Sequence, residues 1–132
     1  MSEKTFLRFT SLTTFIIGSG FLLAPLFVTN IFLRVPMEQG SIFARFLGSA
    51  LMGYSYLNWA TARYNRSDSR EATLIGNLAT LSIALVLSIL AMVNSTFNSK
   101  GILIVLLHLI FAGGFAYYLN KKLTSVKPRS RE

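Results

Sequence analysis

The sequence predicts an all-α membrane protein, with four transmembrane helices in an antiparallel up-down bundle. Hydrophobic residues make up 52% of its 132 positions and only 14% are charged, against about a quarter in an average soluble protein. Four long stretches, 9–33, 46–62, 72–99 and 101–120, contain no Asp, Glu, Lys or Arg. A soluble domain of this size has too little interior to bury so many apolar side chains. We therefore expect lipid to surround the helices.

Each charge-free stretch is long enough for one crossing, because a spanning helix needs about 20 mostly apolar residues. We expect helices at 7–31, 42–63, 70–93 and 101–121 in a single domain, 1–132, which ends in a basic tail, 122–132. The first stretch exceeds the roughly 7 to 15 apolar residues of a signal-peptide core. Pro25 lies within it, where the missing backbone hydrogen bond should kink the helix or end its regular part.

Basic residues predict the orientation of these helices. With four crossings, the N-terminus, the middle loop and the C-terminal tail lie on one side of the membrane. The opposite side has only Arg34, Arg45 and Lys100. An excess of Lys and Arg marks the cytoplasmic side, so both termini should be cytoplasmic, in a pattern that suits a bacterial inner membrane. The first side carries the other ten of the 13 basic residues: Lys4, Arg8, Arg63, Arg66, Arg70, Lys121, Lys122, Lys127, Arg129 and Arg131.

The net charge of +8 is explained by this topology together with attraction of the tail to anionic lipid headgroups. No aromatic residues alternate with the basic ones in the tail, so we expect no nucleic-acid partner. Asp68 is expected to cap the third helix, with Glu71 at its third position. Trp59, Tyr64, Tyr117 and Tyr118 fall near the cytoplasmic ends of their helices and fit an interfacial aromatic belt.

Small residues recur at the spacing that lets membrane helices pack closely. In the third helix they form a four-residue repeat, which should face another helix. We expect these seams to close an intramolecular bundle, and a homo-oligomer or a second membrane protein is the alternative partner. The packing residues are Ala44, Gly48 and Gly53 in the second helix, Ala72, Gly76, Thr80, Ala84 and Ser88 in the third, and Gly113 and Gly114 in the fourth.

The chemistry within the four stretches is sparse. All five acidic residues fall in tails or loops and cysteine is absent, which disfavours an ion-coupled pump and excludes thiolate chemistry. His108 is a conceivable haem or metal ligand, but the sequence specifies no second ligand for it, so we expect no metal and no cofactor. We expect its neutral imidazole to hydrogen-bond across the bundle, and Asn58 and Asn77 to do the same.

Three segments resemble a pattern in small bacterial four-helix membrane proteins that are assigned only to domains of unknown function. These segments are Ala24-Pro25 in the first helix, ARFLG with GYSYLNWATAR in the second, and REATLIGN at the start of the third. The resemblance implies the four-helix membrane fold but no activity. It marks six positions as the first to mutate: Arg45, Gly48, Asn58, Trp59, Gly76 and Asn77.

These observations leave three functional hypotheses. We favour a non-enzymatic accessory or structural component that packs within itself or in a larger membrane complex, because it needs no buried ionised group. The alternative is a membrane-embedded binder or carrier of a lipid, quinone or small solute, with Arg45, Asn58, Asn77 and His108 as its ligand-binding residues. A third hypothesis, suggested by the small size and basic tail, is a holin-like pore former.

Overall fold

The structure is a computed structural model and describes residues 1–35, 41–64 and 67–125. Across these ranges the regular elements are all helical, which confirms the predicted all-α class. They are α1 (Glu3–Leu23), α2 (Pro25–Phe32), α3 (Ser41–Arg63), α4 (Ser67–Val93), the short 3₁₀ helix η1 (Ser99–Gly101) and α5 (Ile102–Ser125).

Three of the described helical segments are long and apolar enough to cross a membrane. They are α1, Asp68–Val93 of α4, and Ser99–Thr124, which comprises η1 and nearly all of α5. The second predicted crossing, 42–63, does form a helix, α3, which is long enough at 23 residues but is less apolar than the other three segments. Its hydropathy is lowered by two arginines, Arg45 and Arg63, and by serine, threonine and asparagine side chains between them.

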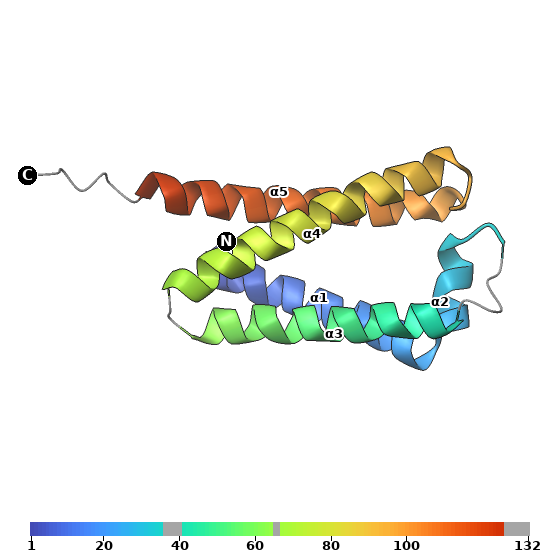
Figure 1. The fold of residues 1–132 in the computed structure, drawn as a ribbon, viewed down its shortest axis with the longest axis horizontal. Coiled ribbons are helices and arrows are strands. Elements are labelled where there is room, and N and C mark those ends of the chain that lie inside the picture. Colours follow the sequence, from blue (N-terminus) through green and yellow to red (C-terminus); the bar gives the residue numbers. More distant parts are fainter. Residues whose placement is uncertain (36–40, 65–66, 126–132) are drawn as a thin grey trace, which may run out of the picture.

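The predicted first helix is divided at Ala24. Ser2 caps α1 by accepting a hydrogen bond from the Thr5 amide, and Glu3 lies in the first turn, where the helix dipole favours an anion. Ala24 leaves the helical conformation, because a following proline disfavours it. Pro25 then begins α2 at the position that needs no N–H donor. Figure 1 shows that α2 turns away from the direction of α1.

The long helices form two pairs, α1 with α3 and α4 with α5 (Figure 1). Two serines join the first pair: the Ser11 hydroxyl donates to the Ser55 carbonyl at 2.8 Å, and the Ser55 hydroxyl donates to the Ser11 carbonyl at 2.9 Å. Further along the same antiparallel register, a Cβ atom on Gly48 would lie 2.8 Å from the Gly18 carbonyl oxygen. The two helix backbones are therefore in contact there.

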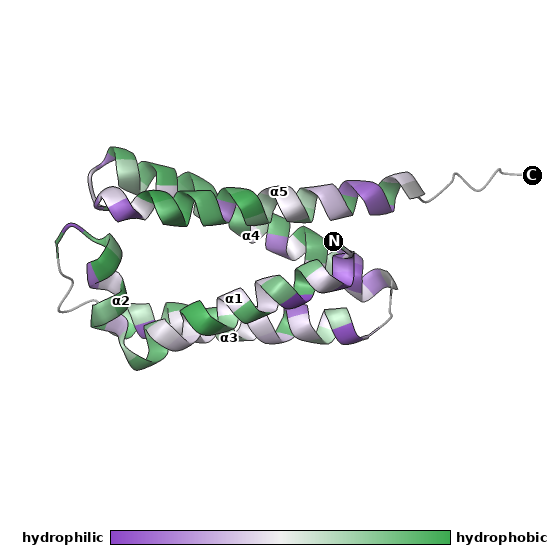
Figure 2. Ribbon diagram, turned by 180° about the vertical axis from the view of Figure 1, so that it is seen from behind, coloured by the Kyte–Doolittle hydropathy of each residue, from purple (hydrophilic) through white to green (hydrophobic). Residues whose placement is uncertain are grey.

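The two pairs meet at the end where the chain starts. Phe6 and Leu7 of α1 pack there in one core cluster with residues of the other three long helices. The Phe6 ring makes an edge-to-face contact with Phe115 at 4.9 Å between centroids. In Figure 2 the hydrophilic colour gathers at this end, whereas the middles of α4 and α5 are strongly hydrophobic. The cluster also contains Ala62, Leu74, Phe111 and Tyr118.

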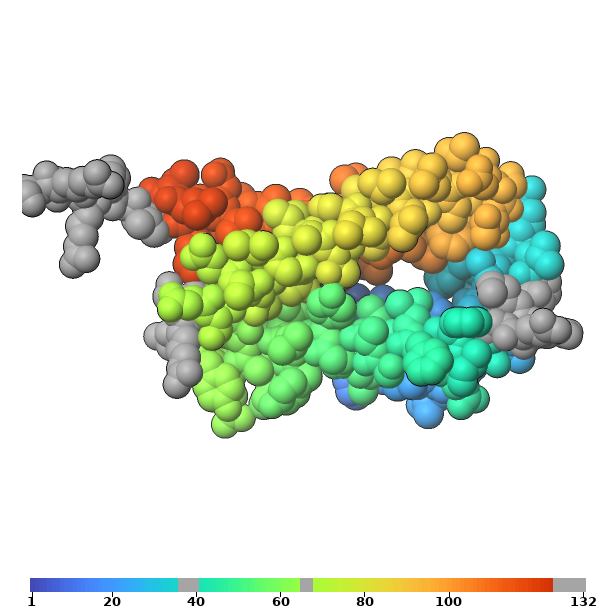
Figure 3. All heavy atoms as spheres, in the orientation of Figure 1, coloured from blue at the N-terminus to red at the C-terminus, as the bar shows by residue number. Residues whose placement is uncertain are grey.

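Backbone and side-chain hydrogen bonds join the pairs again at the opposite end. The Asn98 side chain donates to the Ile31 carbonyl at 2.9 Å, and the Arg34 amide donates to the Thr96 carbonyl at 3.0 Å. These bonds attach the end of α2 to the connection between α4 and η1. Between the two ends, Figure 3 shows an opening between α3 and the α4–α5 pair.

Candidate functional site

The four residues predicted to bind a ligand are not brought together. Asn58 is fully buried and exchanges hydrogen bonds with Asn77, at 2.9 Å and 3.4 Å, across the α3–α4 contact. The Asn77 side chain also donates to the Thr73 carbonyl of its own helix. Cross-helix bonding of both asparagines is therefore confirmed, and it engages their amides with one another.

His108 is also bonded within the protein, as the sequence predicted. Its Nδ1 lies 3.2 Å from the Ser88 hydroxyl, which joins α5 to α4. Over the ranges that the structure describes, no group of three His, Asp or Glu side chains is placed to hold a metal ion. The geometry thus gives His108 a role in helix pairing.

Arg45 lies apart from both asparagines. It is exposed and stands 13 residues before Asn58 on α3, which corresponds to about 20 Å along the helix. Glu38, the acidic residue nearest to Arg45 in the sequence and a candidate acceptor for its guanidinium, lies outside the described residues. The predicted pocket formed by Arg45, Asn58 and Asn77 is therefore not assembled in this structure.

The predicted packing residues divide into two groups. Ala44, Gly48 and Ser88 are buried, and a Cβ atom on Gly114 would collide with the Phe6 ring. In contrast, a Cβ atom on Gly53, Gly76 or Gly113 would meet no atom of the described residues within 4 Å. These three positions are called the open glycines below.

Most of the predicted seam of α4 does not lie against another helix. Ala72 and Gly76 are exposed and Ala84 is partly buried. Thr80 is also exposed, although its hydroxyl lies 2.8 Å from the Tyr54 hydroxyl of α3, and Ser88 is buried. The helix instead turns a stripe of larger side chains toward its neighbours, because burial of their apolar surface against the aromatic rings of α5 outweighs close backbone approach. This stripe contains Leu74, Asn77, Leu78 and Leu81.

Gly18 and the serine pair are contacts that sequence analysis missed. Ser11 and Gly18 stand seven residues apart in α1, and Gly48 and Ser55 stand seven apart in α3. Two antiparallel helices with the same seven-residue spacing of small residues match each other along one face. That repeat is the signal that predicts this contact.

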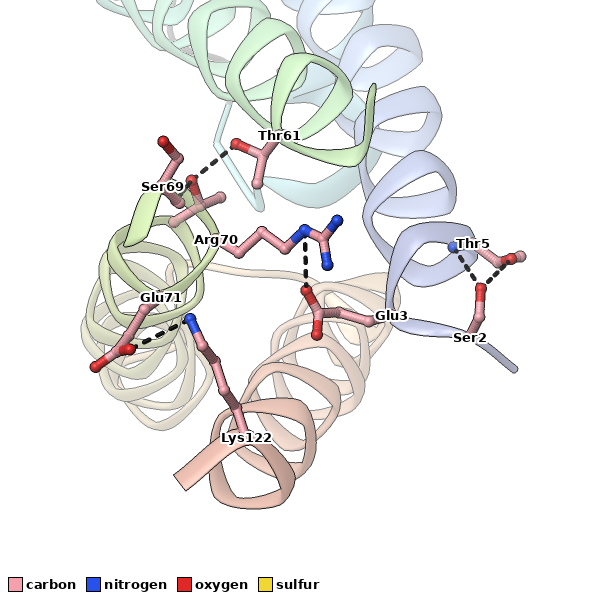
Figure 4. A network of polar contacts seen from close by, with 9 residues as sticks. Ser2, Glu3, Thr5, Thr61, Ser69, Arg70, Glu71 and Lys122 are labelled. Atoms are coloured by element: carbon pink, nitrogen blue, oxygen red, sulfur yellow. Dashed lines mark hydrogen bonds and ion pairs between the residues drawn. The ribbon is translucent and has the colours of Figure 1, made fainter. Parts of the chain in front are cut away.

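Ion pairs close the end of the molecule that carries the N-terminus (Figure 4). Arg70 of α4 lies 3.9 Å from Glu3 of α1, and Lys122 of α5 lies 3.2 Å from Glu71 of α4. Glu71 thus pairs across to α5, and Asp68 lies inside the first turn of α4, so the predicted capping arrangement is wrong. Tyr118 is buried, with its hydroxyl donating to the Met1 carbonyl at 2.6 Å, and does not belong to a surface aromatic belt.

A cleft of about 430 Å³ lies along the α1–α3 pair. Of the residues that line it, Arg8 carries a positive charge, and nearby the Arg63 guanidinium carbon lies 5.4 Å from the centre of the Trp59 ring. The sequence did not predict this cleft, because exposed apolar and aromatic side chains are ordinary on a membrane helix. The lining is Arg8, Ser11, Leu12 and Phe15 from α1, and Met52, Ser55, Tyr56 and Trp59 from α3.

The family suggested by the sequence pattern stays a prediction. Comparison of the chain with protein-family models, with curated proteins and with solved structures finds no match.

Proposed function

We propose that the protein is a non-enzymatic accessory or structural component of a membrane, which packs against helices of another chain. It crosses the membrane four times, with both termini in the cytoplasm. The observation that carries the proposal is the set of open glycines, one on each of α3, α4 and α5, where an added Cβ atom would contact no other helix in the part of the chain that the structure describes.

Packing within the chain does not account for glycine at these three positions, so we look for its role in contacts with another chain. Glycine in a helix interior costs about 1 kcal/mol relative to alanine. Gly18, Gly48 and Gly114 offset this cost by allowing close contacts within the molecule. In lipid, small residues at a helix surface permit a second helix to approach closely. Gly53, Gly76 and Gly113 therefore suit contacts with helices of a larger complex.

The distribution of its polar side chains supports our proposal that α3 also crosses the membrane. Ser55, Asn58 and Thr61 are buried against α1 and α4, so they need no contact with hydrocarbon. The exposed face of the helix carries large apolar side chains, which suit a lipid environment. These are Ile42, Phe43, Phe46, Leu47 and Leu57.

The internal roles of the polar groups also support a packing function. Asn58, Asn77, Ser11, Ser55 and His108 each hydrogen-bond to a neighbouring helix. Bonds of this kind fix helix positions in a membrane. They give the protein a defined shape on which partner contacts can depend.

Photocrosslinking from single cysteines tests the proposal, because the natural chain contains no cysteine. A cysteine-directed crosslinker attached in membranes to Gly76→Cys or Gly113→Cys should give adducts of defined mass. Ile83→Cys is the control, since Ile83 is an exposed large residue of α4 and should react mainly with lipid. Adduct mass distinguishes a second copy from another protein.

Gly76→Leu should remove the partner adduct formed from Gly113→Cys or weaken the complex on gentle extraction, without changing the helix content of the protein. Diffuse labelling from both glycine positions that equals the Ile83→Cys control would contradict the proposed packing role.

A further inference from the structure

We propose that the cleft between α1 and α3 binds one anionic phospholipid. Its phosphate contacts the Arg8 guanidinium, and an acyl chain lies along Leu12, Phe15 and Met52. This binding site is separate from the open glycines, and it does not depend on the proposed packing function.

The charges around the cleft favour an anion. Within the described part of the chain, no carboxylate lines the cleft, and Arg8 has no ion-pair partner. Arginine presents several N–H donors in a planar fork, which matches the oxygens of a phosphate group. The nearby Arg63, held over the Trp59 ring, adds a second positive charge at the same end.

The cleft changes from polar to apolar along its length. Arg8 lies near the beginning of α1, at the end of the molecule where the basic residues gather. Phe15 follows seven residues later in the same wall, about 10 Å deeper along the helix axis. A ligand that fills the cleft therefore needs a negative head and a hydrocarbon chain.

The two serine hydroxyls inside the cleft are already satisfied. The hydroxyl groups of Ser11 and Ser55 bond to the carbonyl groups of the opposite helix. The part of the cleft between these serines and Phe15 thus offers few free donors to a sugar or another polar solute, and its apolar walls suit an acyl chain. Toward the Arg8 end of the cleft, Tyr56 and Trp59 are exposed. Their rings carry a polar group at the tip, as is common for Tyr and Trp at headgroup depth.

The shape of the cleft favours a lipid over a partner helix. Close helix packing in membranes uses small side chains that let two backbones approach. The cleft walls carry Phe15, Tyr56 and Trp59 instead. A flexible chain fits between such rings, whereas a helix backbone is kept at a distance.

The only tryptophan of the chain, Trp59, is a built-in reporter for this site. The protein is placed in phosphatidylcholine vesicles that contain a small fraction of phosphatidylglycerol. Bromine atoms quench tryptophan fluorescence. In one sample the phosphatidylglycerol carries bromine near the carboxyl end of its acyl chains, and in a second sample the same fraction of phosphatidylcholine carries it. We expect brominated phosphatidylglycerol to quench Trp59 more strongly than the same fraction of brominated phosphatidylcholine, and to saturate at low content.

Two variants separate a site from general surface attraction. Lys4→Gln removes one positive charge from an exposed position of α1 outside the cleft, and one surface cation changes anionic-lipid affinity by about fivefold. Arg8→Gln removes the same charge together with the proposed contact, so the preference for phosphatidylglycerol should fall at least about tenfold. Circular dichroism checks that both variants keep their helix content.

The proposal is overturned by any of three results: equal quenching by the two brominated lipids in the natural protein, an equal loss in Arg8→Gln and Lys4→Gln, or full retention of the preference in Arg8→Gln. Protection of Trp59 from both lipids by a co-purified protein would assign the cleft to that protein and would also overturn it.

Discussion

Two adjacent glycines in α5 have different surroundings. A Cβ atom on Gly114 would collide with the Phe6 ring of the core cluster, whereas one on Gly113 would meet nothing within 4 Å. Gly114→Ala should therefore destabilise the protein by about 1 to 3 kcal/mol through overpacking. Gly113→Ala should leave stability unchanged or raise it by up to about 1 kcal/mol, because alanine favours the helix. Thermal unfolding in mild detergent, followed by circular dichroism, measures both; equal effects would contradict the packing of Phe6 on Gly114.

The asparagine pair offers a second comparison between residues. Asn58→Leu leaves the Asn77 amide without its cross-helix partner, although its bond to the Thr73 carbonyl remains. A double-mutant cycle with Asn77→Leu should give a coupling of about 0.6 to 1.7 kcal/mol, the range of hydrogen bonds between membrane helices. Chemical or thermal unfolding of the three variants checks this value. Strictly additive losses would show that the two amides do not stabilise each other.

At the level of elements, the contact between α1 and α3 depends on the two glycines whose backbones touch. Gly48→Leu places a large side chain where the Gly18 carbonyl oxygen would lie 2.8 Å from the new Cβ atom. We expect the helices to separate and stability to fall by at least about 2 kcal/mol. Gly53→Leu is the matched control on the same helix, since its Cβ atom would meet nothing. Unfolding curves and spin-label distances between α1 and α3 report the outcome, and similar behaviour of the two variants would rule out the close contact.

The helices themselves were largely predictable from sequence. The stretches without charged residues indicate where apolar helices form, and Pro25 indicates where the first of them is interrupted. The break at Ala24 follows from Pro25, and the bonded Asn58–Asn77 pair follows from the cost of unpaired amides in an apolar environment. The α4 seam was misassigned since a repeat of small residues at Ala72, Gly76 and Thr80 does not say whether a helix of the same chain lies against it. The ion pairs of Glu3 and Lys122 join segments far apart in sequence, and no local pattern predicts such pairs.

The whole molecule raises the question of how many times the chain crosses the membrane. With α3 across the bilayer, both termini lie on the same side of the membrane, which we propose to be the cytoplasmic side; without it, they lie on opposite sides. An impermeant maleimide should label Asn94→Cys in intact cells. It should label Lys4→Cys and Ser130→Cys only after the cells are permeabilised. Labelling of Ser130→Cys from outside, with Lys4→Cys protected, would reduce the crossings to three.

The candidate site shows the same limit of sequence analysis at the scale of the molecule. Asn58, Asn77 and His108 were identified as polar residues at membrane depth, and their bonds to protein groups were predicted correctly. The cleft of Arg8, Phe15 and Trp59 was not, because the sequence pattern does not show which faces of the two helices lie against each other. Only the α1–α3 contact brings those side chains together.

The pairing of α1 with α3, and of α4 with α5, has a consequence for biosynthesis. A ribosome delivers the first pair completely before the second emerges, so each hairpin is expected to enter the bilayer as an independent stage of assembly. The chain should then tolerate being produced as two separate polypeptides divided directly after Tyr64. Co-expressed halves would reunite through the Phe6 cluster and the asparagine pair, and recovery of both on a tag carried by one of them would reveal that reassembly.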